Sequence, residues 1–520
     1  MKKHSMNSIP MKFSAIAATA FLLLASLAVT RAAQAELPRN VANVQAPLAR
    51  GPLKPHPANP RYFTDGSGKA IYLTGSHTWA NLPDIGPTDP PPAFDFDAYL
   101  DFLRRHNHNF IRLWRWEAVA WDTRSSRNVE PGAINRVAPH PWQRTGPGLA
   151  LDGKPKFDLE KFDPAYFARL RARARAAGQR GIYVSVMLFE GWQLQHIAES
   201  WKDHPFHPAN NVNGIDGDPD GDGRGVETHI LKIPAVTAAQ ERYVRQVIDT
   251  LNDLDNVLYE ISNESGAYST EWQYHLIRFI KQYEKGKPKR HPVGMTFQYS
   301  GDQEQRGSNR LLFDSPADWI SPNLDAVDGY HYKTNPPPAD GRKVIVADTD
   351  HGWGIGGNPA WAWKSFCRGL NPIFMDPYDN RVSGKGSPDQ WDAVRRSLGD
   401  TRRLAERVDL AAMTPHDNLA STKYCLAQPG VEYVIYAPAG GGFTVDLAMA
   451  KDKVFQVRWY NPRTGVFEAA EAIAGGNGSQ GFRAPFEGDA VLHLATLATT
   501  TPAVPDTENW VFLVERKGNP

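Results

Sequence analysis

Eight short apolar runs alternate with helix-like segments between residues 59 and 405, and this alternation constrains the fold more than any other feature of the chain. The runs expected to form strands are 71–76, 109–117, 181–192, 257–261, 292–299, 326–332, 343–351 and 371–379. They are continuously apolar, which is typical of parallel strands buried on both faces. The pattern predicts an α/β fold, a (β/α)8 or TIM barrel enlarged by long loops.

A doubly wound open sheet is the main alternative to a barrel. That fold needs a glycine-rich phosphate-binding loop after an early strand, and the sequence contains none. Helical segments separate most of the expected strands, among them 96–106, 164–178, 236–253 and 270–284. The barrel therefore remains the better interpretation of residues 59–405.

The pattern of predicted elements changes after residue 405. Short strand-like segments such as EYVIYAP and FQVRWYNPRTGVF are separated by turn signals. This pattern predicts an antiparallel β-sandwich over residues 406–500, followed by a tail at 501–520.

The N-terminus has the pattern of a targeting segment. Basic residues at Lys2, Lys3 and Lys12 flank or precede an apolar run at 13–29, and an A-x-A cleavage pattern ends at Ala35. The run is short for a membrane span, so we expect a signal peptide at 1–35, a linker at 36–58 and a secreted or periplasmic protein with no membrane association after cleavage. The formal net charge of +1 gives no electrostatic argument for nucleic-acid binding.

Polar and aromatic residues follow the ends of the expected strands, and these ends converge on one mouth of a barrel. Aromatic rings there can stack on sugar rings, and polar groups can bind sugar hydroxyls. The candidate substrate-binding residues are His77, Trp79, Arg112, Trp116, Glu190, Asn263, Tyr330, His331, Trp353 and Asp376. For any single tryptophan a place in the core is the alternative, and His331 has the alternative of a purely structural role.

Two carboxyl groups that flank a glycosidic bond can hydrolyse it, one as acid and one as nucleophile or base. Glu264 ends the fourth expected strand and is the candidate acid. The seventh strand offers Asp348 and Asp350 as its partner. We favour Asp348 because it directly ends the apolar run, but both share the same strand parity and both stay open. The alternative for either aspartate is a helix cap or an ion pair with Arg112.

These residues resemble the clan A glycoside hydrolases: Asn263-Glu264, a strand-7 acid, Arg112 and the segment Gly329-Tyr330-His331-Tyr332. More narrowly, NPRYFTDGSGKAIYLTGSHTW, NFIRLWRWE and the closing sandwich resemble the apiosidase-like group of bacterial glycoside hydrolases. In that group the barrel precedes a module named for collagen binding. The resemblance covers about residues 59–495.

The resemblance implies Glu264 as acid/base, a strand-7 carboxylate as nucleophile and retention of configuration. The sequence departs from the clan at strand 7, where Asp stands in place of Glu. Because Asp is one methylene shorter, the two carboxyl groups can lie farther apart than the ~5–5.5 Å of retaining enzymes. Retention and inversion both stay open.

The segment DGDPDGDGRGVE, residues 216–227, fits a calcium-loop pattern. The predicted ligands are Asp216, Asp218, Asp220, Asp222 through its backbone carbonyl, and Glu227. Hard oxygen ligands at this spacing suit Ca²⁺, here in an isolated loop without a flanking helix pair. A solvated acidic turn is the alternative. No organic cofactor is expected.

The sequence thus predicts a secreted glycoside hydrolase that acts on a poly- or oligosaccharide. The alternative is a catalytically inactive barrel that binds carbohydrate or collagen. A peptidase is disfavoured because the chain has neither an H-E-x-x-H zinc motif nor a G-x-S-x-G elbow.

Overall fold

The computed structural model describes residues 49–122, 133–197, 199–323, 328–380 and 386–497. The predicted signal peptide, most of the predicted linker and the predicted tail lie outside the described residues. The described residues belong to one compact unit that begins at Pro47. No helix among them is both long enough and apolar enough to cross a membrane.

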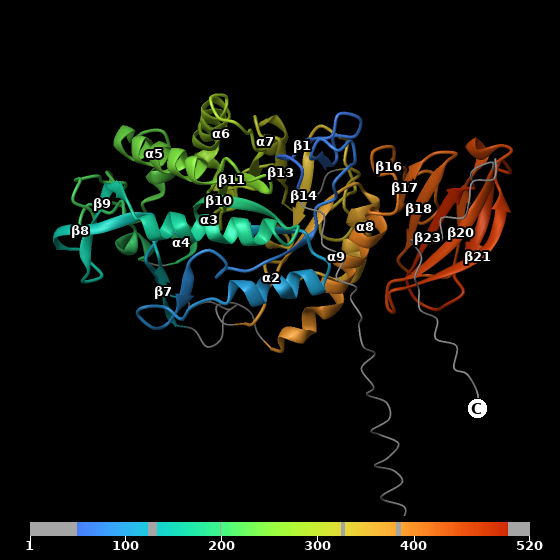
Figure 1. Cartoon of the computed structure of the whole chain (residues 1–520), viewed down its shortest axis with the longest axis horizontal. Coiled ribbons are helices and arrows are strands. Elements are labelled where there is room, and N and C mark those ends of the chain that lie inside the picture. Colours follow the sequence, from blue (N-terminus) through green and yellow to red (C-terminus); the bar gives the residue numbers. More distant parts are fainter. Residues whose placement is uncertain (1–48, 123–132, 198, 324–327, 381–385, 498–520) are drawn as a thin grey trace, which may run out of the picture. The chain divides into compact units, whose positions relative to one another are not determined.

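Eight parallel strands form the nearly closed barrel that the sequence predicted (Figure 1). In spatial order they are β3 (Gly75–His77), β15 (Asn371–Met375), β14 (Val344–Asp348), β13 (Trp319–Ser321), β12 (Val293–Thr296), β11 (Val257–Asn263), β10 (Tyr183–Glu190) and β5 (Phe110–Leu113). The segments before β3 and β5 are joined because the backbone N–H of Asn109 donates to Thr74 O and its Oδ1 accepts from Thr74 N–H, each at 2.9 Å. The carboxyl ends of these strands meet at one mouth.

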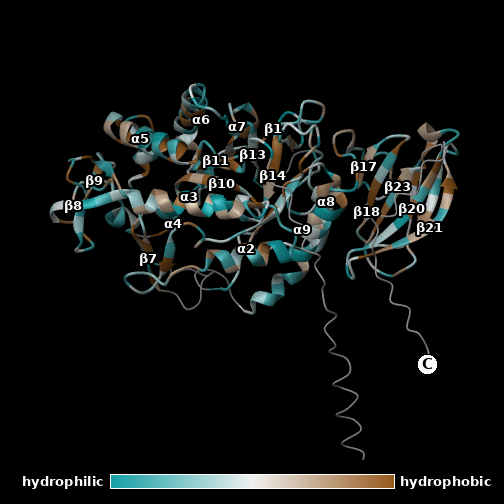
Figure 2. Ribbon diagram, in the orientation of Figure 1, coloured by the Kyte–Doolittle hydropathy of each residue, from teal (hydrophilic) through white to brown (hydrophobic). Residues whose placement is uncertain are grey.

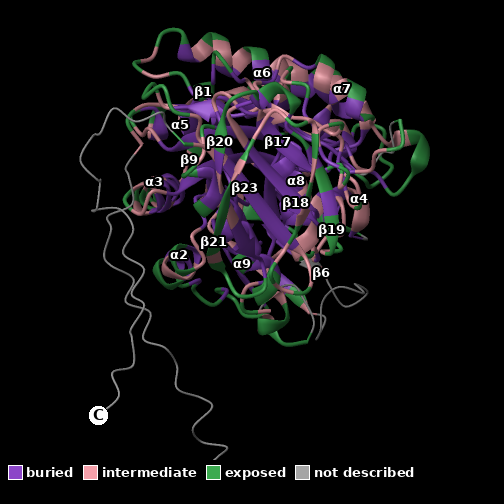
Figure 3. Cartoon of the chain, turned by 90° about the vertical axis from the view of Figure 1, so that its right-hand side faces the viewer, coloured by how far each residue is buried: buried purple, intermediate pink, exposed green. Residues whose placement is uncertain are grey.

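Helices surround the barrel, and their sequences explain where they begin and which face they bury. Asp95 caps the first of them by accepting a hydrogen bond from Ala98 N–H, and Asp163 caps another ahead of a proline at its first turn. The α-helices are α2 (Phe96–Arg105), α3 (Pro164–Gly178), the short α4 (Trp192–His196), α5 (Pro234–Leu251), α6 (Thr270–Glu284), α7 (Asn309–Asp314), α8 (Pro359–Cys367) and α9 (Asp392–Ala405). Hydrophobic and hydrophilic residues alternate along them (Figure 2), and exposed residues mark the outer sides of α2 and α6 (Figure 3).

The sixth barrel strand is not where the sequence placed it. The prediction for 326–332 was wrong, because the strand is β13, whose Trp319 is fully buried and pairs with Gly294 and Val344. Residues 328–332 form a turn and an isolated bridge between His331 and Asn335 instead. A three-residue strand carries too little apolar pattern to compete with the longer AVDGYHY run.

The long loop between β5 and α3, joined by β4 from the loop between β3 and α2, forms two small sheets. One contains β4 (Asp84–Gly86), β7 (Ile134–Ala138) and β6 (Ala120–Asp122), and the other is the hairpin of β8 (Trp142–Leu149) and β9 (Pro155–Phe162). Near the N-terminal end, β1 (Lys54–Pro55) pairs with β2 (Phe63–Thr64), and Leu53 is buried against the barrel. An ordered strand thus lies within the last residues of the predicted linker.

The C-terminal part is antiparallel, as predicted. Its six-stranded sheet runs β16 (Thr414–Pro415), β17 (Cys425–Gln428), β18 (Glu432–Ala437), β23 (Ala490–Thr496), β20 (Val454–Asn461) and β21 (Val466–Ala474). A second sheet pairs β19 (Gly442–Asp446) with β22 (Ser479–Arg483). Phe443 of the small sheet packs on Trp459 of the large one, with ring centroids 5.9 Å apart, so the two sheets share a core.

Candidate active site

Arg112 of β5 is the centre of the site and is 1% exposed. Its Nε and Nη2 donate to the two carboxylate oxygens of Glu260 at 2.9 and 2.5 Å. Nη2 also donates to Asn263 Oδ1 at 2.6 Å, and Nη1 donates to Asp348 and Asp350 at 2.9 and 3.1 Å. Burial alone would lower the pKa of Arg112, but the three carboxylates raise it above its ordinary value. The guanidinium therefore stays charged and joins β5, β11 and β14.

Asp348, at the end of β14, has its hydrogen-bonding capacity filled. Trp114 Nε1 donates to His77 Nδ1 at 2.7 Å, so His77 Nε2 carries a hydrogen and donates to Asp348 at 2.9 Å. The carboxylate also accepts from Arg112 and from Asp350 N–H, and its side chain is 0% exposed. Burial opposes the charge, but His77 and Arg112 hold the pKa of Asp348 well below its usual value. Asp348 is therefore a fixed anion.

Asp350 lies in the short turn η5 (Thr349–His351) that Asp348 caps. Its side chain is 5% exposed and accepts a hydrogen bond from Arg112. Burial raises the pKa of Asp350 to about 6, the charge of Asp348 adds to this, and Arg112 acts in the opposite direction. Asp350 is thus less tightly held than Asp348 and titrates near neutral pH.

Glu264 follows β11 and has a left-handed backbone with φ of +49°, a conformation that non-glycine residues rarely adopt. It is 7% exposed, and its Oε2 is buried without a hydrogen-bond partner among the described residues. His196 Nε2 lies 3.8 Å from Glu264 Oε2, and burial lowers the pKa of His196. Burial raises the pKa of Glu264 well above its usual value, and the charge of Asp350 raises it further against the opposing effect of Arg112. Glu264 is therefore a neutral carboxylic acid that can donate a proton.

The strand next to Glu264 approaches it closely. Asn263 lies opposite Glu190 of β10 in the parallel ladder. A Cβ on Gly191 would lie 2.9 Å from Glu264 O and 2.5 Å from Ser265 Oγ, so only glycine fits there. This contact fixes the backbone that carries Glu264.

A second buried group lies beside Glu264 and was not predicted as a group. Glu117 accepts from His204 Nε2 and His229 Nε2 at 3.1 Å each and from Glu190 N–H at 2.8 Å. Burial works against the charge of Glu117, but His229 and His204 hold its pKa well below its usual value. Burial and the neighbouring charge of Glu117 raise the pKa of Glu190 well above its usual value. Glu190 therefore lies beside the site as a neutral group.

Several predicted aromatic residues pack among themselves. Trp79 and Trp116 are 6% and 2% exposed, and their rings lie 5.4 Å apart. Trp114 stacks on Trp116, and Trp192 packs on Trp79. Trp353 is less buried, with Lys333 Nζ 4.8 Å from its ring.

The side chains of three predicted residues turn to other partners. Tyr330 donates to Asp417 at 2.7 Å, and His331 Nδ1 accepts from Lys333 N–H within a local turn. Asp376 accepts from Arg395 Nε and Nη2 at 2.8 and 2.5 Å. The structure therefore does not bring them to the carboxylates around Arg112.

Sequence reasoning missed Glu260, His196 and His229. Glu260 lies in the middle of an apolar strand, and the two histidines end the short helices α4 (Trp192–His196) and η2 (Val226–His229), where no motif marks them. Only their contacts with Arg112, Glu264 and Glu117 reveal them.

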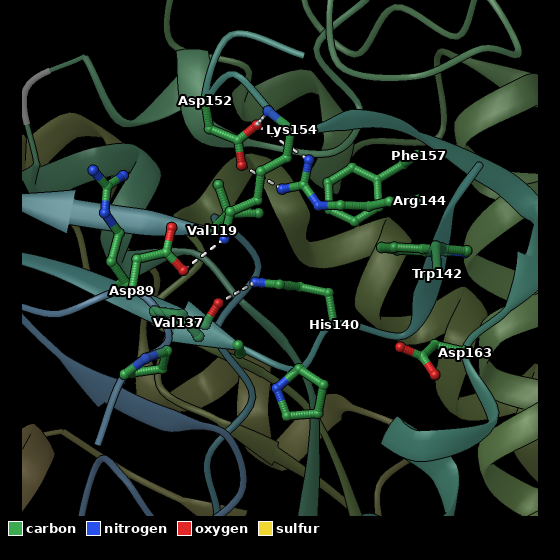
Figure 4. Close-up of a pocket in the computed structure, with 14 residues that line it drawn as sticks. Asp89, Val119, Val137, His140, Trp142, Arg144, Asp152, Lys154, Phe157 and Asp163 are labelled. Atoms are coloured by element: carbon green, nitrogen blue, oxygen red, sulfur yellow. Dashed lines mark hydrogen bonds and ion pairs between the residues drawn. The ribbon is translucent and has the colours of Figure 1, made fainter. Parts of the chain in front are cut away.

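Two of the cavities in the described residues bear on the site. A small one, of about 10 Å³, is lined by Asp348, His351, Trp353 and Trp361 and has room for about one water. A larger one of about 260 Å³ lies between β7, β8 and β9 (Figure 4). Within its lining Asp89 pairs with Lys154 and Arg144 with Asp152, and none of the predicted site residues lines it.

The acidic loop brings four carboxylates together. Asp218, Asp220, Asp222 and Glu227 each offer an oxygen, and these oxygens lie within 4.8 Å of one another. Asp218 Oδ1 and Glu227 Oε2 are buried without a hydrogen-bond partner in the described part of the chain, and Asp218 is 6% exposed. Burial and the neighbouring carboxylates raise the pKa of both. The group could bind a metal ion.

The predicted ligand set needs two corrections. Asp216 lies outside the group, and its Oδ1 accepts from Asp218 N–H at 3.0 Å. Asp222 offers a side-chain oxygen, where the sequence pattern offered its backbone carbonyl.

Two family models match parts of the chain. Residues 112–301 match one described as "Domain of unknown function (DUF6298)", and residues 412–494 match one described as "Putative collagen-binding domain of a collagenase". No curated protein sequence matches the chain.

Solved structures match over most of the chain. A protein described as a putative glycoside hydrolase from Bacteroides vulgatus is similar with a TM-score of 0.57 at 13% identity, over 86% of this chain and 82% of its own. The chain has a glycoside hydrolase-like fold. Another structure, described as a glycoside hydrolase, gives a TM-score of 0.55 at 12% identity, covering 86% and 98% of the two chains. A family 5 glycoside hydrolase from Bacteroides vulgatus gives 0.53 at 12% identity, covering 86% and 94%.

Proposed function

We propose that this glycoside hydrolase-like protein cleaves O-glycosidic bonds, with Glu264 as the acid and Asp350 as the nucleophile or base. The observation that carries the proposal is the different protonation state of the two carboxyl groups. Burial without a hydrogen-bond partner keeps Glu264 protonated, while Asp350 beside Arg112 ionises at a pKa of about 6. A pair of carboxyl groups with separated pKa values is what acid–base cleavage of a glycoside requires.

Asp350 is preferred to Asp348 because of the contacts each makes. Asp348 is 0% exposed at its side chain and is bound by His77, Arg112 and the Asp350 N–H. A carboxylate held in this way cannot approach a sugar carbon without breaking those bonds. Asp348 instead orients Arg112 and caps the turn that carries Asp350.

In the proposed reaction Glu264 gives its proton to the leaving glycosidic oxygen as the C–O bond breaks. The ionised Asp350 either attacks the anomeric carbon or removes a proton from the attacking water. Arg112 limits the charge that accumulates among Glu260, Asp348 and Asp350. Asn263 adjoins Glu264 and can place its amide N–H₂ toward a sugar hydroxyl, since its Oδ1 already accepts from Arg112.

We also propose that the carboxylates of Asp218, Asp220, Asp222 and Glu227 bind Ca²⁺. The loop contains Gly221 and Gly223, both with positive φ, and offers only oxygen ligands. Ca²⁺ accepts many oxygens in irregular geometry, whereas Mg²⁺ needs a near-octahedral set and keeps its waters. We further propose that the N-terminal targeting pattern directs export of the protein and that its substrate is a carbohydrate.

The test of the enzyme is Glu264→Gln assayed on a broad panel of oligosaccharides and aryl glycosides. Gln keeps the size and neutrality of the acid but has no proton to give, so hydrolysis of unactivated glycosides should fall by about 10²–10⁴-fold. Glu271→Gln, an exposed change on α6, is the matched control and should leave the rate unchanged. A wild-type protein that cleaves nothing in the panel, or a Glu264→Gln variant as active as wild type, overturns the proposal.

A further inference from the structure

One short turn connects the acidic loop with the surroundings of Glu264. The turn is η2 (Val226–His229), and it contains Glu227 of the acidic group and His229 two residues later. Thr228 between them is anchored twice, because its Oγ1 donates to Gly225 O and its carbonyl accepts from Gln240 Nε2, each at 2.7 Å. Gln240 belongs to α5, so the turn is attached to the barrel wall.

The His229 end of the turn reaches the residue next to the acid. His229 is 0% exposed, and its Nδ1 lies 3.2 Å from Ser265 Oγ, while its Nε2 donates to Glu117 at 3.1 Å. With Nε2 carrying the hydrogen, Nδ1 accepts from the Ser265 hydroxyl. Ser265 directly follows Glu264 in the chain. His229 therefore connects η2 to the backbone that positions the acid.

The acidic loop packs too tightly on this turn to move independently of it. A Cβ on Gly217 would lie 2.6 Å from Thr228 and 2.7 Å from Trp201. A Cβ on Gly225 would lie 2.1 Å from the Trp201 ring. Both glycines thus allow the loop to lie directly against Trp201 and η2, and a displacement of the loop is transmitted to the turn.

Electrostatic repulsion among the carboxylates of the loop would cause such a displacement. Within the described chain, none of the four carboxylates forms an ion pair with a lysine, arginine or histidine. Ionised carboxylates at this spacing repel one another, and a divalent cation reverses that repulsion. A cation bound there would therefore hold Glu227, and with it η2, in place.

We propose that Ca²⁺ bound by the acidic loop fixes η2 and so holds His229, Ser265 and the backbone of Glu264 in their working positions. The inference rests on the proposed function for the role of Glu264. The connection itself rests on the contacts of Glu227, Thr228 and His229. Its consequence is that removal of Ca²⁺ loosens the segment around Glu264.

Hydrogen exchange read by mass spectrometry tests this connection without a substrate. The full chain is freed of metal with EGTA and measured with and without added CaCl₂. Peptides that cover 226–230 and 262–268 should exchange about tenfold more slowly with Ca²⁺, while β18 should not change. Slowing that is confined to 216–227 overturns the proposal, as does an absence of any Ca²⁺ effect.

A matched pair of variants identifies the ion site as the cause. Asp220→Asn removes one exposed ligand charge, and Asp216→Asn makes the same change at a residue outside the group. The first should abolish the Ca²⁺ effect at 262–268, and the second should keep it. If both variants respond like wild type, another site binds the ion and the proposal is overturned.

The catalytic consequence is measured separately with any glycoside that the wild type cleaves. Because small misplacements of a catalytic group cost large factors, EGTA or Asp220→Asn should lower kcat about tenfold, with KM unchanged, well below the unfolding temperature. Unchanged kcat contradicts the proposal. If no glycoside is cleaved but Ca²⁺ still slows exchange at 262–268, the proposed function fails and the connection stands.

Discussion

Two groups of carboxylates lie in this molecule, and they differ in how their charge is compensated. At the barrel mouth, Glu260, Asp348 and Asp350 surround Arg112, and His77 adds a further donor. In the loop at 216–227, four carboxylates lie together with no cationic side chain paired to them among the described residues. The charge of the first group is compensated within the chain, whereas the proposed Ca²⁺ would compensate that of the second.

Glu264 is a third case, and it shows what the comparison means for function. Glu264 is not hydrogen-bonded to a guanidinium and does not belong to the acidic group. Protonation therefore removes the energetic cost of burying its charge. Compensated carboxylates fix geometry, an uncompensated group is suited to bind a cation, and an isolated buried carboxyl keeps a proton that it can donate.

The largest expected effect comes from breaking the compensated group. Arg112→Met leaves three buried carboxylates without their guanidinium and should lower the free energy of unfolding by about 3–5 kcal/mol. Urea denaturation measures it. The control is Arg171→Met, which removes a pair with Asp253 whose side chains are 41% and 63% exposed and should cost about 0–1 kcal/mol. Equal losses of unfolding free energy in the two variants would contradict the expected difference between the buried group and the exposed ion pair.

A smaller loss is expected when only one carboxylate of that group is neutralised. Asp348→Asn keeps the shape but weakens the bonds from His77 and Arg112, and should cost about 1–3 kcal/mol at neutral pH. Because the pKa of Asp348 is lowered by folding, its stabilising contribution is present above the unfolded pKa of about 4 and is lost as the pH falls below it. The wild type and the variant should therefore converge in stability on acidification, and a gap that widens instead would refute this assignment.

The uncompensated group should gain stability when it binds an ion. Ca²⁺ at a hundredfold excess over Kd should raise the free energy of unfolding by about 2.7 kcal/mol, read as a higher Tm in thermal unfolding. Mg²⁺ at the same concentration should give less. A response to Ca²⁺ in Asp220→Asn equal to that in Asp216→Asn would mean that the ion binds elsewhere.

The barrel could be predicted because its strands and helices carry strong local patterns. The prediction of the sixth strand was wrong because the local pattern there is weak. The true strand, β13, has only three residues, and AVDGYHY is the longer strand-like run. Tyr330 and His331 were proposed as mouth residues on the strength of that strand, and their contacts lie elsewhere.

The candidate site shows a different limit. Strand ends located Glu264, Asp348 and Asp350, because the parallel barrel makes such ends converge. Choosing between the two aspartates depended on which one binds His77, a residue 271 positions away in the sequence. Glu260 looked like an isolated charge within a strand until Arg112 was placed beside it. Charge partners of this kind are set by the fold, and no local pattern encodes them.

The pH dependence of kcat/KM, compared between the wild type and Glu264→Gln on activated aryl glycosides, tests the division of roles most directly. The wild type should give a bell-shaped profile, with an acid limb near pH 6 as Asp350 ionises and an alkaline limb at higher pH as Glu264 loses its proton. Glu264→Gln should keep the acid limb and lose the alkaline one. An alkaline limb that persists in Glu264→Gln would show that Glu264 is not the acid.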